Sequence, residues 1–206
     1  MIPLIIHQTW KTSDLPPEFA RCQQTWQDLH PDFEYKLHTD EDNLRLVAGH
    51  YPSWFNIYQG FPHDIQRADM ARVMWLHYEG GIYADMDLEA FKSVLPLMDR
   101  ETLFDEPEPH PFDEENVICN FVMIADRGSS FMYRLVLEMT KPYDYRGKYH
   151  ANAVCETTGP LLVTKVFKQL LQERWAKLPR VMRNCWTAQS NQEYGHHHFA
   201  STWHSR

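Results

Sequence analysis

The sequence predicts an α/β fold with a largely parallel sheet, and three observations point to this class. Short apolar runs that suit buried strands alternate along the chain with segments of helical periodicity. Gly-Gly and Gly-Pro steps separate several of these segments, as expected where helices end or begin. The length of 206 residues suits one hydrophobic core, so we expect a single domain over 1–206.

The first fifty residues predict two strands and two helices. Leu4-Ile5-Ile6 is a continuous apolar run, which is typical of a strand covered on both faces. Pro17 suits the first turn of a helix, and apolar residues follow it at helical spacing: Phe19, Cys22, Trp26 and Leu29. Apolar and polar residues alternate over 33–37, which predicts a second strand. We expect Asp40 to cap a helix that runs through Val47.

The middle of the chain predicts a helix over 65–79, with Asp64 as its cap and Gly80-Gly81 as its end. A short strand over 82–84 follows, and a longer apolar strand is expected over 117–125. Ligands bind beyond the carboxyl ends of strands in sheets of this class. The residues that directly follow 82–84 are therefore expected to lie at a site.

Two more helices are expected in the last third of the chain. Ser129 or Ser130 is positioned to cap a helix that runs through Met139. Gly159-Pro160 opens an amphipathic helix, because apolar residues recur after it on one helical face: Val163, Val166, Phe167 and Leu170. These segments complete the alternation of strands and helices on which the fold class depends.

Composition limits the partners and the compartment. The net charge of −8 argues against binding to nucleic acid or to an anionic membrane, since both need a basic face. The N-terminal apolar run ends by His7, short of the roughly 20 residues that span a bilayer, so we expect no integral membrane segment. The four cysteines are widely spaced, and we expect them to be reduced thiols: Cys22, Cys119, Cys155 and Cys185. Reduced thiols suit a cytoplasmic protein, and peripheral attachment to the membrane stays open.

Asp85 and Asp87 follow the 82–84 strand and are the main candidates for chemistry. On extended chain, residues two positions apart point to the same side. Two carboxylates at the end of a strand can share one hard divalent cation, and Mg²⁺ or Mn²⁺ prefers such oxygen ligands. The alternative is a solvated turn, because this short pattern is common. The strand directly before it, after a helix end, favours a metal site.

Asp69 and Arg72 form a second candidate pair. They lie three positions apart on the 65–79 helix and so share a face. Most of the surrounding residues are apolar, so the helix is expected to be buried. Burying two charged side chains costs free energy unless the charges pair with each other or take part in binding. A structural ion pair and a ligand-binding pair therefore remain open.

These motifs resemble the DXD-containing glycosyltransferases of family 32, which include initiating α-1,6-mannosyltransferases and bacterial capsular polysaccharide transferases. Residues 2–11 are similar to the first-strand signature of that family. Arg67, Asp69 and Arg72, followed by 80–87, match its central motif almost position for position. Later family landmarks are similar to Asn120, 158–160 and 197–203. The resemblance thus runs from residue 2 to residue 203.

The resemblance implies a GT-A type fold and a retaining transfer of a hexose. The implied donor is a nucleotide-diphosphate sugar, either a UDP- or a GDP-hexose, and the implied acceptor is a glycan or a lipid-linked molecule. Mn²⁺ or Mg²⁺ is the implied cofactor. The catalytic residues that it implies are Asp69, Arg72, Asp85 and Asp87. The donor-binding residues that it implies are His7, Gln8, Thr9, Trp10, Asp69, Arg72, Gly81, Tyr83, Asn120 and Trp203.

The tail supplies the remaining implied metal ligands. The family's closing pattern is a His pair, an aromatic residue and Ser-Trp. The resemblance implies that His198, in preference to His197, and Thr202 bind the metal together with Asp85 and Asp87. The chain reads Ser201-Thr202-Trp203 where Gly-Ser-Trp is more typical of the family. The hydroxyl ligand therefore moves to Thr202. A surface cluster of histidines is the alternative interpretation of 196–198.

Two other functions are alternatives to transfer. Paired aspartates also occur in metal-dependent phosphohydrolases, but the sequence shows no nucleophile elbow and no clustered His/Asp series for that chemistry. A non-catalytic module that binds sugar nucleotides or glycans is the second alternative. The intact set of Asp69, Arg72, Asp85 and Asp87 argues against an inactive site. Turnover of a bound donor would distinguish an enzyme from a binding module.

Overall fold

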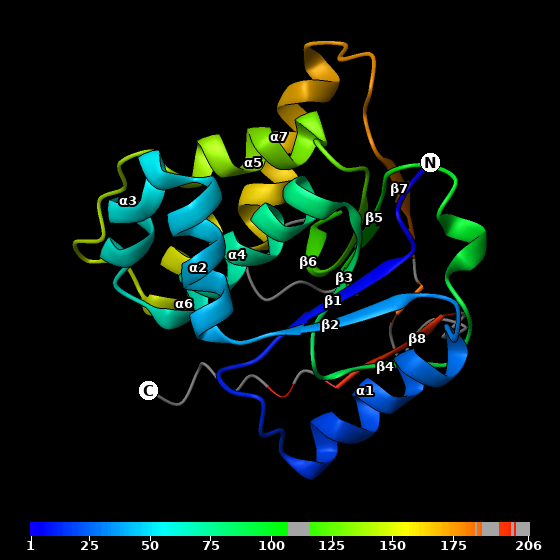
Figure 1. Ribbon diagram of the computed structural model, residues 1–206. Coiled ribbons are helices and arrows are strands. Elements are labelled where there is room, and N and C mark those ends of the chain that lie inside the picture. Colours follow the sequence, from blue (N-terminus) through cyan, green and yellow to red (C-terminus); the bar gives the residue numbers. More distant parts are fainter. Residues whose placement is uncertain (107–115, 184, 187–193, 199, 201–206) are drawn as a thin grey trace.

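The computed structural model of the chain describes residues 1–106, 116–183, 185–186, 194–198 and 200. At its centre lies a six-stranded sheet in the order β2-β1-β3-β6-β5-β7 (Figure 1). The strands of this sheet are β1 (Ile5–Thr9), β2 (Glu34–His38), β3 (Gly81–Ala84), β5 (Thr102–Asp105), β6 (Ile118–Ala125) and β7 (Arg180–Met182).

The strand directions confirm an α/β fold with a largely parallel sheet. β1 is parallel to both β2 and β3, and β5 is parallel to β7. β6 is antiparallel to its neighbours β3 and β5. Among the described strands of this sheet, β6 therefore runs against the other five. This mixed sheet with one reversed strand, flanked by helices, is a GT-A type fold.

A second sheet has two short strands, β4 (Leu88–Ala90) and β8 (Gly195–His197), which pair antiparallel. Neither strand was expected from the sequence, because three residues are too few to show a period of two. Leu88 lies opposite His197 in this pairing. We call this two-stranded sheet the β4–β8 ribbon, and it carries a distant part of the chain to the end of β3.

Helices lie on both sides of the central sheet (Figure 1). α1 (Pro17–Leu29) lies on one side together with the β4–β8 ribbon. The remaining helices gather on the other side: α2 (Asp40–His50), α3 (Phe55–Gly60), α4 (Asp64–Glu79), α5 (Ser130–Met139), α6 (His150–Thr157) and α7 (Pro160–Gln172). Short 3₁₀ helices are η1 (Pro52–Trp54) and η2 (Leu95–Leu97). The molecule thus has three layers with the sheet in the middle.

Two hydrophobic cores fill the spaces between these layers. In β3, Tyr83 packs into the core that α4, α5 and α7 cover, whereas Ile82 packs into the core that contains Trp26 of α1. Successive residues of a strand point to opposite faces, so one strand contributes to both cores. All eight residues of β6 are buried. A strand covered on both faces reads as a continuous apolar run, which is why the sequence identified it.

Two expected helix caps are wrong by one residue. α2 begins at Asp40, but its N-cap is Thr39, whose hydroxyl accepts from the Asp42 N–H while the Asp42 carboxylate accepts from the Thr39 N–H. This reciprocal capping box satisfies two backbone donors, which a cap at Asp40 would not. α4 begins at Asp64, so Asp64 is the first helical residue, and His63 is an N-cap without a side-chain hydrogen bond.

The other expected helix limits are confirmed. Ser129, one of the two alternatives, caps α5 by accepting from the Met132 N–H. Pro160 opens α7 after Gly159, as expected for a proline in the first turn. Gly80 ends α4 with a φ of 75°, a left-handed conformation that favours glycine.

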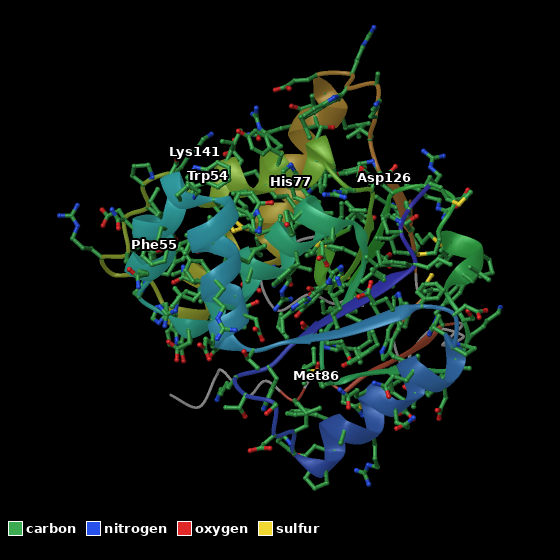
Figure 2. All side chains as sticks on the ribbon, viewed as in Figure 1. Trp54, Phe55, His77, Met86, Asp126 and Lys141 are labelled. Atoms are coloured by element: carbon green, nitrogen blue, oxygen red, sulfur yellow. The ribbon has the colours of Figure 1, made fainter. Side chains whose placement is uncertain are left out.

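The reversal of β6 separates two ends of the sheet. Figure 2 shows Met86, which follows β3, and Asp126, which follows β6, at opposite ends of the molecule's central sheet. Residues at the carboxyl end of β3 therefore meet those at the carboxyl end of β1, and not those that follow β6. All four cysteines are buried, and none of them forms a disulfide among the described residues. Among the described residues, no helix is both long and apolar enough to cross a membrane.

Candidate metal centre and donor site

Two glycines set the turn from α4 into β3. A Cβ atom on Gly80 would lie 2.6 Å from the Arg127 backbone nitrogen, and one on Gly81 would lie 2.5 Å from the Ile5 carbonyl oxygen. Both residues also have positive φ values, 75° and 108°. Only glycine fits this close approach of β3 to β1. Gly81 thus serves the packing of β3 on β1, and its expected contact with the donor stays a prediction.

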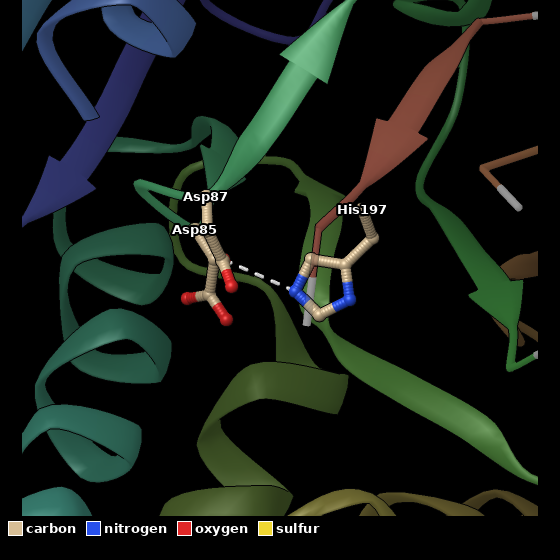
Figure 3. A group of neighbouring side chains, drawn as sticks. All are labelled: Asp85, Asp87 and His197. Carbon is tan, nitrogen blue, oxygen red and sulfur yellow. Dashed lines mark hydrogen bonds and ion pairs between the residues drawn. The ribbon is translucent and has the colours of Figure 1, made fainter. Parts of the chain in front are cut away.

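Asp85 and Asp87 stand at the carboxyl end of β3, as expected. The Asp85 N–H donates to the Phe121 carbonyl (2.8 Å), and the Leu88 N–H donates to the Asp85 carbonyl (3.1 Å). These bonds hold the loop between β3 and β4 in one path. With His197, the two carboxylates offer ligand atoms that all lie within 4.8 Å of one another (Figure 3). Among the described residues this is the group that could hold a metal ion.

His197 reaches this group through the β4–β8 ribbon. Its Nε2 lies 3.1 Å from Asp87 Oδ1, and its ring stacks on Phe121 at 4.2 Å between centroids. A Cβ on Gly195 would lie 2.1 Å from the Glu89 carbonyl oxygen, so glycine is required for the ribbon to close. The Ala200 N–H donates to Asp87 Oδ2 at 2.8 Å. The last described part of the chain therefore completes the site.

The structure places His197, and not the preferred His198, beside Asp87. The His198 side chain is 44% exposed, and its Nε2 lies 3.1 Å from Glu89 Oε2. Neighbouring side chains on extended backbone point to opposite sides, so only one of the two imidazoles can face Asp87. The sequence showed the histidine run but not the register of the ribbon, and the register decides between them. Thr202 and Trp203 lie outside the described residues.

Burial and neighbouring charges give the two aspartates opposite shifts. Burial raises the pKa of Asp85, the Asp87 carboxylate adds to this, and the Arg72 guanidinium opposes it. Burial also tends to raise the pKa of Asp87, but the hydrogen bond and charge of His197, with the Ala200 N–H, hold it below its usual range. Asp87 is therefore anionic at neutral pH and available to a cation.

Asp69 and Arg72 form an ion pair directly beneath Asp85. Arg72 Nη2 lies 3.1 Å from Asp69 Oδ1, and Nη1 lies 3.1 Å from Asp85 Oδ1. Nη1 also donates to the Asn120 carbonyl at 2.8 Å. Asp69 accepts from the Asn120 side-chain amide (2.9 Å) and from the Thr158 hydroxyl (2.8 Å). The structure thus brings Asp69, Arg72, Asp85 and Asn120 together, as expected, and adds Thr158.

This inner pair is buried, with side-chain exposures of 3% for Asp69 and 5% for Arg72. Burial raises the pKa of Asp69 to about 6, although Arg72 and Thr158 oppose the shift. Burial would lower the pKa of Arg72, but Asp85 and its other anionic neighbours raise it well above its usual range. These contacts are those of an internal ion pair that supports Asp85. Direct contact of Asp69 or Arg72 with a donor sugar stays a prediction.

The first strand lies beside the site, but two of its expected donor-binding residues face inward. His7 and Gln8 are fully buried. His7 Nε2 donates to the Gly80 carbonyl (2.8 Å), and the Gln8 amide donates to the Asp85 carbonyl (3.1 Å). Their polar atoms thus bond within the protein, and their expected contact with a donor stays a prediction. Thr9 and Trp10 are partly exposed, and their contact with the donor stays a prediction.

The amino-acid sequence is similar to known glycosyltransferases that carry a DXD motif. A family model described as the glycosyltransferase sugar-binding region containing a DXD motif matches residues 16–104. Inositol phosphoceramide mannosyltransferase 3 of Schizosaccharomyces pombe is 33% identical over 98% of the chain and 56% of the relative. A mannosyl phosphorylinositol ceramide synthase of Saccharomyces cerevisiae is 31% identical over 85% of the chain and 44% of the relative. The chain thus spans about half the length of these relatives.

Solved structures support the fold. The PaToxG glycosyltransferase superposes with a TM-score of 0.61 and 17% identity, over 86% of this chain and 73% of that one. At this identity the likeness concerns the fold, which is of the GT-A type. Three observations indicate the same family: the DXD motif at Asp85 and Asp87, the match to the family model and the mannosyltransferase relatives. The chain belongs to the DXD-containing glycosyltransferases of family 32.

Proposed function

We propose that the chain is a metal-dependent retaining glycosyltransferase that moves a hexose from a nucleotide-diphosphate sugar to an acceptor hydroxyl. The observation that carries this proposal is the cluster of Asp85, Asp87 and His197 at the carboxyl end of β3. Two carboxylates and one imidazole are a suitable ligand set for a divalent cation, and the imidazole favours Mn²⁺ over Mg²⁺. Thr202 is proposed as an additional ligand.

The chemistry of the cluster fits such an ion. Asp85 Oδ2 has no hydrogen-bond partner among the described residues, and Asp87 is anionic because His197 and Ala200 stabilise its charge. The Arg72 guanidinium offsets part of the repulsion between Asp85 and its acidic neighbours. When bound, the ion would neutralise charge on the diphosphate of the donor and of the leaving nucleotide.

The proposed roles of the other residues follow from their positions. Trp10 would stack on the nucleotide base from the end of β1, with Thr9 beside it and Trp203 on the tail. Asp69 would accept from hydroxyls of the donor sugar, and Arg72 would hold Asp69 and Asp85 in place. The acceptor hydroxyl attacks the anomeric carbon on the face that the diphosphate leaves, and a departing phosphate oxygen takes the proton. Positioning and charge stabilisation supply the rate enhancement.

The names of the relatives favour a mannosyl donor and a lipid acceptor. The two sequence relatives described above are named for mannosyl transfer and for inositol-containing ceramides. We therefore propose GDP-mannose as the first donor to test and an inositol phosphoceramide as the first acceptor. UDP-glucose, UDP-galactose and UDP-N-acetylhexosamines remain the alternative donors.

Nucleotide release from a panel of GDP- and UDP-sugars, without an acceptor, tests the proposal. Release is expected from one donor with Mn²⁺ and is expected to stop with EDTA. Asp87→Asn should abolish the reaction with an unchanged circular dichroism spectrum. Glu89→Gln is the matched control, because Glu89 is a nearby carboxylate outside the metal cluster.

Two results would count against the proposal, one against the metal centre and one against transfer itself. Activity of Asp87→Asn at the wild-type level would remove the metal-centre assignment. The absence of both nucleotide release and donor binding by calorimetry, across the whole panel, would overturn the transferase proposal. Phosphate-ester substrates would then be the next test, because paired aspartates also serve in metal-dependent phosphohydrolases.

A further inference from the structure

The hydroxyl of Tyr83 lies behind Asp85 and not at the surface. Tyr83 is 1% exposed and packs in the core that α4, α5 and α7 cover. Its O–H donates to Asp85 Oδ1 at 2.7 Å, and its oxygen lies 3.0 Å from the Thr9 hydroxyl. Its ring lies beneath the Arg72 guanidinium, 4.7 Å from centroid to Cζ. These contacts lead to the Asp85 carboxylate, and the expected contact of Tyr83 with a donor stays a prediction.

The direction of the two hydrogen bonds follows from the proton count. A phenol has one proton, and a carboxylate only accepts, so the Tyr83 proton lies on the bond to Asp85. Thr9 must then donate its own proton to the Tyr83 oxygen. The result is a short chain of hydrogen bonds that runs from the end of β1, through Tyr83 of β3, to Asp85 in the loop between β3 and β4. Successive hydrogen bonds in one direction strengthen each other in a buried setting.

This chain of hydrogen bonds ends on one oxygen of the Asp85 carboxylate, Oδ1. Oδ1 accepts from Tyr83 at 2.7 Å and lies 3.1 Å from Arg72 Nη1. Oδ2 has no partner among the described residues. In Asp87, by contrast, Oδ1 meets His197 and Oδ2 accepts from Ala200. Rotation of the Asp85 carboxylate would break two charge-assisted contacts, so Oδ2 stays available beside Asp87 and His197.

We propose that Tyr83, supported by Thr9, is a positioning residue that holds Asp85 Oδ2 ready for a divalent cation. This inference rests on the proposed function, since it deepens the role of the same metal centre. Partners that orient metal ligands commonly change metal affinity by 10- to 100-fold when they are removed. Loss of the Tyr83 hydroxyl should therefore weaken metal binding before any effect on chemistry.

Titration of the purified chain with Mn²⁺ alone, followed by the electron paramagnetic resonance signal of the free ion, tests this. Tyr83→Phe keeps the buried ring and removes only the hydroxyl, and it is expected to weaken Mn²⁺ binding about tenfold or more. Thr9→Val keeps both the Tyr83 hydroxyl and the shape of the side chain. It should weaken binding by a smaller factor, about threefold.

Tyr51→Phe is the matched control. The Tyr51 hydroxyl also has two partners, the Met74 carbonyl (3.2 Å) and His77 Nδ1 (2.7 Å), but neither belongs to the metal cluster. It should lower the melting temperature about as much as Tyr83→Phe and leave Mn²⁺ affinity unchanged. If Tyr83→Phe does not fold, Thr9→Val decides, because weaker binding supports the proposal and unchanged binding overturns it.

The remaining outcomes separate this inference from the proposed function. A wild-type chain that binds Mn²⁺, with a folded Tyr83→Phe variant of equal affinity, overturns the positioning role and leaves the metal centre in place. A wild-type chain that does not bind Mn²⁺ overturns the metal centre itself. With an active donor in hand, Tyr83→Phe should raise the Mn²⁺ concentration needed for half-maximal rate and leave the donor KM at saturating Mn²⁺ unchanged.

Discussion

Arg72 joins the inner and outer acidic groups of the site. One guanidinium nitrogen approaches Asp85 and the other approaches Asp69, each at 3.1 Å. A guanidinium presents several N–H groups in a rigid planar fork, whereas a lysine ammonium is a single point charge on a flexible stem. This geometry explains why arginine suits the position. It also means that the loop carrying Asp85 depends on a helix residue thirteen positions earlier in the chain.

Replacement of Arg72 should unfold the protein more readily. Arg72→Met leaves the buried Asp69 and the half-buried Asp85 without their counter-charge, and losses of about 3–5 kcal/mol are typical when one partner of a buried pair is removed. Urea unfolding at pH 7.5 measures the change. Arg67→Met is the control, because its partner Asp64 is 70% exposed and such pairs contribute about 1 kcal/mol or less. Equal losses in the two variants would contradict the internal role of Arg72.

The two neighbouring histidines should differ in their effect on metal binding. His197→Gln removes the imidazole that faces Asp87 and should weaken Mn²⁺ binding about tenfold or more. His198→Gln removes an exposed imidazole that faces Glu89 and should leave binding unchanged. Calorimetric Mn²⁺ titration of both variants gives the comparison. The opposite ranking would restore His198 as the ligand and would require a different register of the β4–β8 ribbon.

At the scale of secondary-structure elements, a buried histidine pair connects β1, β2 and α4. His7 Nε2 donates to the Gly80 carbonyl, which leaves Nδ1 to accept from His38 Nε2 at 2.9 Å. The His38 ring stacks on Trp75 of α4 at 3.8 Å. Burial lowers the pKa of His7 to about 4 and that of His38 to about 3. Both imidazoles are thus neutral in the folded protein at neutral pH.

This pair predicts a loss of stability in acid. The nearby carboxylates of Glu79, Glu34 and Asp42 oppose the lowered pKa values without preventing them, and the Lys36 ammonium adds to the lowering. The unfolded chain takes up protons as the pH falls through about 6.5, and the folded chain does so only near 4 and 3. The contribution of the pair is therefore fully present above pH 6.5 and is lost as the pH falls toward 4. Urea unfolding at pH 7.5, 6 and 5 measures it.

A single substitution identifies the source of this pH dependence. His38→Phe keeps a ring against Trp75 and removes one of the two buried imidazoles. Its unfolding free energy should vary less steeply with pH between about 6.5 and 4 than that of the wild type, whatever its absolute stability. His50→Gln, which removes a histidine at an exposed position of α2, is the comparison variant. An unchanged slope in His38→Phe would assign the acid sensitivity to other groups.

At the scale of the whole molecule, metal binding should stabilise the fold. A ligand that binds only the folded state at 100 times its Kd adds about 2.7 kcal/mol. For a chain of this size, each kcal/mol raises the melting temperature by roughly 2–4 °C. Saturating Mn²⁺ should therefore raise the Tm by roughly 5–10 °C relative to EDTA, as measured by scanning calorimetry. Asp87→Asn should lose this shift, and an equal shift in that variant would place the bound ion elsewhere.

The fold class and most elements could be predicted because their signals are local. A continuous apolar run identified β6, and glycine steps marked the end of α4 and the start of α7. The direction of β6 could not be predicted, since a strand buried on both faces reads the same in either direction. The caps at Thr39 and His63 were displaced by one residue because two polar residues compete at each helix start.

In the candidate site, too, residues with local sequence signals could be predicted, whereas those placed by long-range contacts could not. Asp85 and Asp87 were predictable because a strand and a helix end precede them within a few residues. The position of His197 depends on a ribbon of two three-residue strands, and the bond of Thr158 to Asp69 joins residues far apart in the chain. The burial of His7, Gln8 and Tyr83 could not be predicted, because a motif shows which residues gather, whereas the packing around them sets their exposure.

The β4–β8 ribbon has a consequence for the order of events during synthesis. A ribosome makes β1, β2, β3, β5 and β6 before it reaches Gly195. A nascent chain can therefore form much of the central sheet, including the loop with Asp85 and Asp87, while His197 has not yet been translated. On the proposed assignment, all three ligands come together only after that segment has emerged and paired with β4. Metal binding through the full set would then come late, after translation through the ribbon.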